Sequence, residues 1–187
     1  MKSAIKILCA IMFFLPLCAV AREDVRTYLA KVDTPAVWIN PKKIKVYVEP
    51  SAKSNILERA FKIWDDAMRS DMNFIFVKNA NEADITIDYI ETLTGSAVGI
   101  THSNHITIQG KIYLSKTKVL VAKKDPIGFI QSDAQLLKVA LHEIGHAIGV
   151  LGHSNSINDI MYYSTASTKN SSPSLRDIDT VNKLYGF

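Results

Sequence analysis

Apolar and polar residues follow two different periods in the first half of the chain, and each period predicts one type of secondary structure. Residues 44–48 and 84–89 alternate between the two classes, as half-buried strands do, and residues 74–77 form a short apolar run that fits a further strand. Between them, apolar residues recur at helical spacing after Ser54, which we expect to cap this helix. Its apolar face comprises Leu57, Ala60, Phe61, Trp64 and Met68. This alternation of strand and helix favours an α/β sheet.

The middle of the chain has a weaker pattern. Residues 95–104 are rich in Gly, Ser and Thr, which predicts a loop. Residues 106–114 have strand character and are interrupted by Gly110, which fits a bulge or a hairpin turn near a sheet edge. Residues 115–130 contain two lysine pairs and an Asp-Pro step, and they predict a connector.

Two helices are expected in the last third. Ser132 and Gln135 form a capping-box pattern at the start of the first helix. Its apolar stripe comprises Leu137, Leu141, Ile144 and Ile148. Pro173 and Ser174 introduce the second helix, which begins a short distance before the end of the sequence. Its apolar face comprises Leu175, Ile178, Val181 and Tyr185.

The first of these helices carries side chains that can bind a metal. His142 and His146 are one turn apart on the face opposite the apolar stripe, so two imidazoles can reach one ion beside Glu143. Gly149 can end the helix in a left-handed turn, after which the chain swings round to deliver His153. Three neutral imidazoles with an open fourth position are typical of catalytic zinc. The pattern therefore predicts a zinc hydrolase, and a chance His-Glu-x-x-His string on a polar helix face is the alternative.

The first 21 residues have the three parts of a secretory signal. Lys2 and Lys6 precede an apolar stretch, and a small-x-small site predicts cleavage after Ala21. A membrane anchor is the alternative, but a bilayer-spanning helix needs about 20 apolar residues and the uncharged run covers only residues 7–21. We therefore expect a secreted protein, periplasmic or extracellular, without stable membrane insertion once the signal is removed.

Composition excludes other classes. The formal net charge is only +4, and the lysines form only small groups and no extended basic cluster. Nucleic-acid binding is therefore not indicated. Cys9 and Cys18 are the only cysteines and both lie in the signal, so the processed chain has no disulfide and no thiolate ligand. Residues 22–37 lack periodicity and predict a short N-terminal arm.

The string from His142 to His153, followed eight residues later by Met161, resembles the metzincin zinc proteases. Within that group it is most similar to the matrixins, and in particular to small, secreted proteins of the bacterial type. The pattern His-Glu-x-x-His-x-x-Gly-x-x-His is met except that the third histidine comes one residue late, after Gly152. The resemblance covers residues 38–187 and implies one catalytic domain. The implied α/β (α+β) fold has a twisted mixed β-sheet with two helices in an N-terminal lobe. The active-site helix, a methionine turn (Met-turn) and the C-terminal helix lie in a small second lobe.

The resemblance also implies roles for the motif residues. His142, His146 and His153 would hold a catalytic Zn²⁺, and Glu143 would activate the zinc-bound water as a general base. Met161 would form a hydrophobic floor under the metal. The implied activity is that of a secreted zinc-dependent endopeptidase, a metalloprotease that hydrolyses peptide bonds.

Four more side chains have an open role. Tyr163 stands where some metzincins place a tyrosine that touches zinc or stabilises an oxyanion, and an ordinary, partly buried aromatic is the alternative. Asp159 is the residual candidate for a third ligand, since Glu143 is the last glutamate and His153 the last histidine. His102 and His105 could help to hold a second, structural zinc, but they are interpreted first as surface residues. Structural Ca²⁺ is also compatible with the family, although no pattern specifies a site.

The resemblance further implies a protein or peptide substrate that lies extended along an edge strand, expected at residues 106–114, and binds by β-augmentation to a monomer. Acidic residues of the arm, Glu23, Asp24 or Asp33, could cap the zinc in a latent form. Two rival functions remain: a non-proteolytic binding protein with a metzincin fold, and a zinc hydrolase acting on cell-wall peptides.

Overall fold

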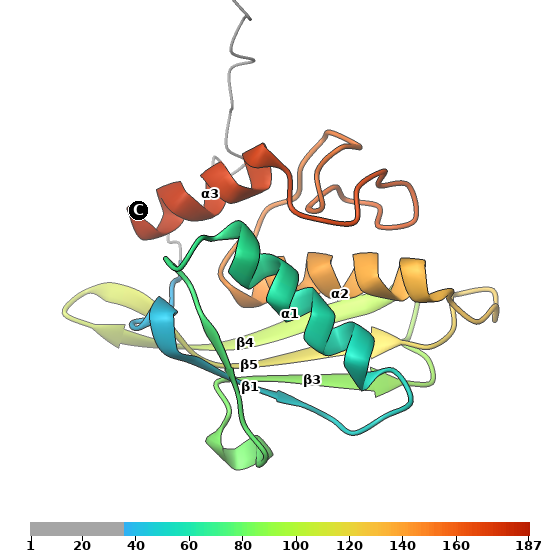
Figure 1. Ribbon diagram of the computed structural model, residues 1–187, viewed down its shortest axis with the longest axis horizontal. Coiled ribbons are helices and arrows are strands. Elements are labelled where there is room, and N and C mark those ends of the chain that lie inside the picture. The colour runs from blue at the N-terminus through green and yellow to red at the C-terminus, as the bar shows by residue number, and fades with distance from the viewer. Residues whose placement is uncertain (1–35) are drawn as a thin grey trace, which may run out of the picture.

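The computed structural model describes residues 36–187 (Figure 1). The predicted signal, its cleavage site after Ala21 and the acidic residues of the arm lie outside the described residues. Within residues 36–187, no helix combines the length and the hydrophobicity that crossing a bilayer requires.

Five strands form one mixed sheet that lies below the helices in Figure 1. In chain order they are β1 (Ile44–Val48), β2 (Phe74–Phe76), β3 (Ile85–Ile90), β4 (Gly99–Ile108) and β5 (Lys111–Ala122). Their spatial order is β2-β1-β3-β5-β4, and all neighbours are parallel except β4 and β5. Strand β4 is therefore an edge strand, and its outer side pairs with no other described strand. The mixed α/β architecture expected from the sequence is confirmed.

The three early strands lie within one residue of their predicted bounds, but the middle of the chain differs from the prediction. Residues 99–104 belong to β4 and are not a loop, and β5 continues to Ala122 through the segment expected to be a connector. Residues 106–114 form a hairpin, one of the two structures that Gly110 suggested, with a two-residue turn in which Gln109 has φ 50° and Gly110 φ 77°. Strand β4 lacks an apolar alternation because most of its side chains are exposed.

Three α-helices accompany the sheet: α1 (Ser54–Ala67), α2 (Asp133–Ala147) and α3 (Leu175–Tyr185), with 3₁₀ turns at η1 (Pro41–Lys43) and η2 (Ala80–Glu82). Ser132 and Ser174 cap α2 and α3 in capping boxes, as their sequences predict. Ser54 is the first helical residue and not the cap of α1, because its hydroxyl donates back to the carbonyl of Glu49.

Helices α1 and α2 lie side by side on one face of the sheet (Figure 1), and two buried tryptophans fix the position of α2. The indole of Trp64, from α1, donates to the carbonyl of Leu141 at 2.9 Å. The indole of Trp38, from the segment before β1, donates to the carbonyl of Ala147 at 3.0 Å. Buried indole N–H groups require such partners. The helix that carries the histidines is therefore held at two points along its length.

The chain after α2 passes over the side of α2 that faces away from the sheet and ends in α3 (Figure 1). Ile160, Met161 and Val181 from this region join the same hydrophobic core as α1, α2 and the sheet. The region is thus packed onto α2 directly above its histidines.

Candidate metal centre and catalytic cleft

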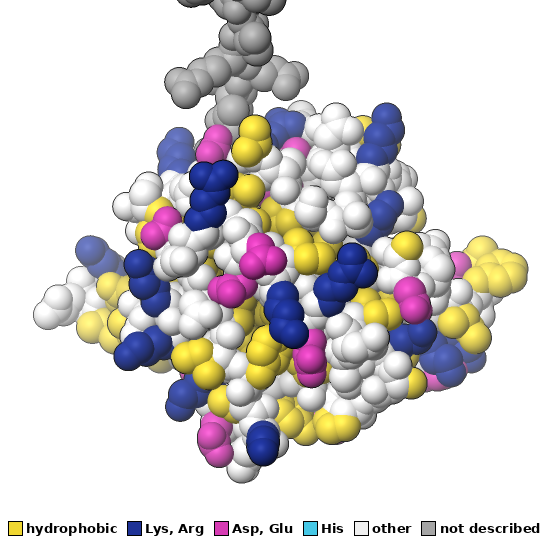
Figure 2. Space-filling view, viewed as in Figure 1, with side chains coloured by type: hydrophobic (Ala, Val, Ile, Leu, Met, Phe, Trp, Pro, Cys, Tyr) yellow, Lys and Arg dark blue, Asp and Glu magenta, His cyan; other side chains and the backbone are white. Residues whose placement is uncertain are grey.

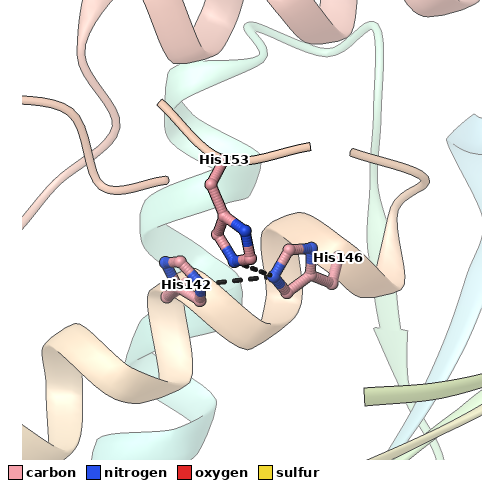
Figure 3. Close-up of side chains that lie close together, drawn as sticks. All are labelled: His142, His146 and His153. Carbon is pink, nitrogen blue, oxygen red and sulfur yellow. Dashed lines mark hydrogen bonds between the residues drawn. The ribbon is translucent and has the colours of Figure 1, made fainter. Parts of the chain in front are cut away.

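Helix α2 and the segment after it bring three imidazoles together (Figure 3). The Nε2 atom of His146 lies 3.2 Å from Nε2 of His142 and 3.2 Å from Nε2 of His153. One ligand atom from each of the three rings lies within 4.8 Å of the others. Among residues 36–187, this is the one group of three or more histidine, cysteine, aspartate or glutamate side chains that converges in this way.

Backbone carbonyls fix which nitrogen of two of these rings carries the proton. Nδ1 of His142 donates to the carbonyl of Ile160 at 2.9 Å, and Nδ1 of His146 donates to the carbonyl of Val150 at 2.6 Å. In the neutral imidazole this leaves only a lone pair on each Nε2. The dashed contact between these two Nε2 atoms in Figure 3 is therefore an approach of two acceptors and not a hydrogen bond.

The three rings are held in the neutral form that a metal requires. Burial lowers the pKa of His142 to about 3, with a smaller effect from the neighbouring His146. Burial also lowers the pKa of His146 to about 4 and lowers that of His153. Neutral imidazole is the metal-binding species, so no proton has to leave these rings near neutral pH.

The donor set fits zinc. Zinc–nitrogen bonds of about 2.0–2.1 Å in a tetrahedral site place two ligand nitrogens roughly 3.3 Å apart. The two Nε2 separations of 3.2 Å match that spacing before any rearrangement. The carbonyl partners on Nδ1 are the outer contacts that orient metal-bound histidines. Residues His142, His146 and His153 can therefore hold a zinc ion.

The additional residue before His153 is accommodated in a short exposed segment. Gly149 adopts φ 101°, the left-handed conformation expected at this helix end, and the N–H of Val150 then donates to the carbonyl of Gly145. Leu151 follows with 43% of its surface exposed. Ser154, directly after His153, is fixed again because its N–H donates to the carbonyl of Met161 at 2.7 Å.

A tight turn at residues 159–162 supports the centre from the side opposite the sheet. It is closed by a hydrogen bond from the N–H of Tyr162 to the carbonyl of Asp159 at 3.2 Å. The N–H groups of Ile160 and Met161 donate to the carboxylate of Asp177 in α3, at 2.8 and 3.3 Å. The start of α3 therefore holds the turn that orients His142.

Met161 is fully buried and packs against α2 between its two histidines. A Cβ atom placed on Gly145 would overlap the sulfur of Met161, so the methionine lies directly on the helix backbone. A side chain at position 145 would separate the turn from α2. The structure thus places Met161 in the packing position that the sequence suggested, under the helical turn that carries the histidines.

Asp159 does not join the three histidines. Its carboxylate accepts hydrogen bonds from the hydroxyls of Ser154 and Ser174 and pairs with Arg176 at 2.8 Å. Only 3% of its surface is exposed. These contacts give Asp159 a structural role in joining the segment after His153 to α3, whereas His153 supplies the third ring.

Glu143 lies beside the centre with 6% of its surface exposed. Burial raises the pKa of its carboxyl group to about 7, and a hydrogen bond from Thr101 opposes that rise. The hydroxyl of Thr101 lies 2.7 Å from Oε2 of Glu143 and 3.0 Å from its carbonyl oxygen. A cation held by the histidines would favour the ionised carboxylate.

A cleft of about 1050 Å³ connects these residues. Its walls comprise β4 with the residues before it, the loop between β5 and α2, the three histidines with Glu143, and residues 163–166. Tyr163 lines the wall opposite the sheet, is 66% exposed and lies against the ring of Tyr162, with centroids 4.3 Å apart. His102 and His105 are exposed on β4, and neither belongs to a metal-binding cluster of described residues.

Two residues of this site were not singled out from the sequence. Thr101 lay in a segment interpreted as a loop, although the β-branched residues at both ends of Gly99–Ile108 were a strand signal. Asp177 occupies the third position after the cap Ser174, a pattern that predicts a helix start but not a contact with a distant turn.

The sheet, the histidine-bearing helix and the methionine turn define a metzincin-like domain. A family model described as Matrixin matches residues 37–186. The chain belongs to the matrixin family.

Two curated relatives are plant metalloendoproteinases. Metalloendoproteinase 2-MMP from Arabidopsis thaliana is 30% identical over 143 residues, which are 71% of this chain and 36% of that protein. Metalloendoproteinase 1-MMP from the same plant is 27% identical over 147 residues, which are 75% of this chain and 40% of that protein. The match therefore covers less than half the length of either relative.

A solved structure of myroilysin shares the fold. It superposes with a TM-score of 0.51 at 16% identity and covers 81% of this chain and 96% of that one. At this identity the likeness concerns the fold alone.

Proposed function

We propose that this chain is a zinc-dependent endopeptidase with Glu143 as its general base. The observation that carries the proposal is the convergence, in one cleft, of three neutral imidazoles and a buried carboxylate beside an edge strand. The names of the plant relatives and the family membership support the same activity. A protein that only stored or bound zinc would have no need of a base beside the metal.

Each group has a distinct role in this proposal. His142, His146 and His153 hold the ion, which supplies a Lewis acid that polarises a carbonyl and makes water acidic. Glu143 accepts a proton from the attacking water and passes it to the departing amine nitrogen. In the metal-free protein, burial raises the pKa of Glu143 to about 7, and an ion held by the histidines would lower it by favouring the carboxylate, the form that accepts the proton.

The substrate is proposed to lie along β4. The N–H of Ala122 donates to the carbonyl of Val98, so in this antiparallel pair the even-numbered residues of the start of β4 bond to β5. The backbone groups of Gly99, Thr101 and Ser103 consequently face the free edge. An extended peptide can pair with them next to Glu143. The expected segment, residues 106–114, overlaps this edge at residues 106–108, the end of β4.

The loop between β5 and α2 gives one end of the cleft an apolar wall. Ile127, Phe129 and Ile130 are 79%, 69% and 64% exposed and line the cleft. Asp125 holds this loop in shape by accepting hydrogen bonds from the N–H groups of Ile127 and Phe129. The loop projects at the right of Figure 1, where Figure 2 shows a hydrophobic tip. We propose that it contacts apolar side chains of the substrate.

Export is part of the proposal. The basic, apolar and small-residue sections of residues 1–21 support secretion with cleavage after Ala21. Determining the N-terminal residue of the protein recovered outside its producing cells tests this directly. Arg22 is the expected first residue, and a retained Met1 would contradict it.

The activity is tested with a peptide library incubated with the zinc-loaded protein, with the chelated protein and after zinc is added back. We expect internal peptide bonds to be cleaved only when zinc is present. A protein that binds one zinc but cleaves no peptide would be a binding protein. Cleavage confined to muropeptides would indicate a cell-wall hydrolase.

A further inference from the structure

Thr101 contacts the proposed general base and the proposed substrate path at the same time. Its hydroxyl is 2.7 Å from Oε2 of Glu143, on the face of the sheet that α2 covers. Its backbone N–H and C=O face the free edge of β4, as the register with β5 requires. The side chain of Thr101 therefore contacts the proposed base, and its main chain faces the path proposed for the substrate.

The hydroxyl can serve Glu143 in both of its protonation states. When the carboxylate is ionised, the Thr101 hydroxyl donates to Oε2. When Glu143 carries a proton, the hydroxyl can accept from the carboxyl group and turn its own hydrogen to the Glu143 carbonyl, which is 3.0 Å away. A hydroxyl group has the one donor and two acceptor sites that this exchange needs, whereas a valine of the same shape has neither.

Gly99 confines the same carboxylate from a second direction. A Cβ atom at position 99 would lie 2.6 Å from both Cγ and Oε1 of Glu143. The carboxylate thus rests against the bare backbone of β4, and a side chain there would displace it. The same Cβ atom would lie 2.8 Å from Cγ1 of the buried Val139, so a side chain at position 99 would also press on α2.

We propose that Thr101 is a positioning residue that holds the Glu143 carboxylate in register with a peptide paired to the edge of β4. This inference rests on the proposed function, because it requires that Glu143 is the general base and that a peptide substrate lies along β4. Misplacement of a catalytic group by about 1 Å can reduce turnover about 100-fold. The hydroxyl is expected to affect turnover and not substrate binding, since the backbone of residue 101 pairs with the peptide whatever its side chain.

The test compares kcat and KM of T101V, T101S and the wild-type zinc enzyme. Thr107 provides the matched control T107V, because it lies on the same strand with an exposed side chain. We expect T101V to lower kcat by about 10- to 100-fold with little change in KM, and T101S to restore most of it. G99A should also lower kcat, because the added methyl group displaces the carboxylate of Glu143.

Two results would overturn the proposal. One is a kcat for T101V that equals that of T107V. The other is an equal loss in T101S and T101V, which would indicate that the shape of the side chain matters and not its hydroxyl.

A second measurement does not depend on activity. In the metal-free protein, T101V should lower the urea unfolding midpoint more in the wild-type background than in E143A, where the carboxylate is missing. Equal shifts in both backgrounds would show that the hydroxyl and the carboxylate do not interact. If no variant, the wild type included, cleaves any peptide, the proposed function fails, and the unfolding comparison still decides whether the contact exists.

Discussion

The carbonyl oxygen of Ile160 accepts a hydrogen bond of 2.9 Å from Nδ1 of His142. This carbonyl belongs to the turn whose N–H groups, at Ile160 and Met161, donate to Asp177 in α3. The orientation of a candidate metal ligand is thus coupled to a helix that follows it by many residues in the chain. Asp177 is fully buried, so its carboxylate acts within the packed core.

Replacing Asp177 with Asn should weaken both the fold and the metal site. An amide cannot accept hydrogen bonds at both of its terminal atoms, so at least one buried N–H loses its partner, at about 1–3 kcal/mol. Because the turn orients His142, zinc affinity should also fall by about 10-fold or more. Urea unfolding and competition with a chelating dye measure the two effects.

The matched control for that change is D179N. Asp179 lies on the same helix with an exposed side chain, so the control alters the net charge equally without touching the turn. If D177N and D179N bound zinc with equal affinity, the turn would not orient the ligand.

Replacing His153 should show which of the two candidates, His153 or Asp159, is the third metal ligand. H153A should bind zinc at least 100-fold more weakly, because a three-coordinate set becomes a two-coordinate one. Zinc should raise the thermal unfolding midpoint of the wild type and, at the same concentration, barely raise that of H153A. D159N should lose stability but still respond to zinc. A strong response in H153A and none in D159N would make Asp159 the ligand.

The hydroxyl of Tyr185 predicts how stability depends on alkaline pH. It accepts from the N–H of Trp38 and donates to the carbonyl of Ile148, and burial raises its pKa well above the usual value. An unfolded tyrosine ionises near pH 10. Its contribution to stability is therefore constant below about pH 10 and is lost as the pH rises above that value.

Urea unfolding of the metal-free protein between pH 8 and pH 11 tests this dependence. The stability of Y185F should fall less steeply above about pH 10 than that of the wild type. Y163F is the control, because the side chain of Tyr163 is largely exposed. Parallel pH profiles for the wild type and Y185F would contradict the assignment.

The features that could be predicted from the sequence are those set by short-range spacing. His142 and His146 are neighbours on any α-helix, and Ser132 with Gln135 marks where that helix begins. Buried strands such as β3 show a clear alternation because one face must be apolar. These local rules are sufficient to predict the helix and its two histidines.

The remainder depends on contacts between distant segments. The first part of β4, residues 99–104, was missed because an exposed edge strand needs no apolar period. The contact of Thr101 with Glu143 was missed with it. The late third histidine was assigned from the sequence only by its spacing from Met161, with Asp159 left as the alternative. Its position follows from the hydrogen bond between Ser154 and Met161, which closes the segment whatever its length.

The most direct test of the account is the activity and the zinc content of E143A. The three histidines are untouched, so this variant should bind one zinc ion with near wild-type affinity. Loss of a general base costs about 10²- to 10⁴-fold in rate, and peptide cleavage should fall by at least that factor. A zinc-loaded E143A that still cleaved peptides at the wild-type rate would contradict the account.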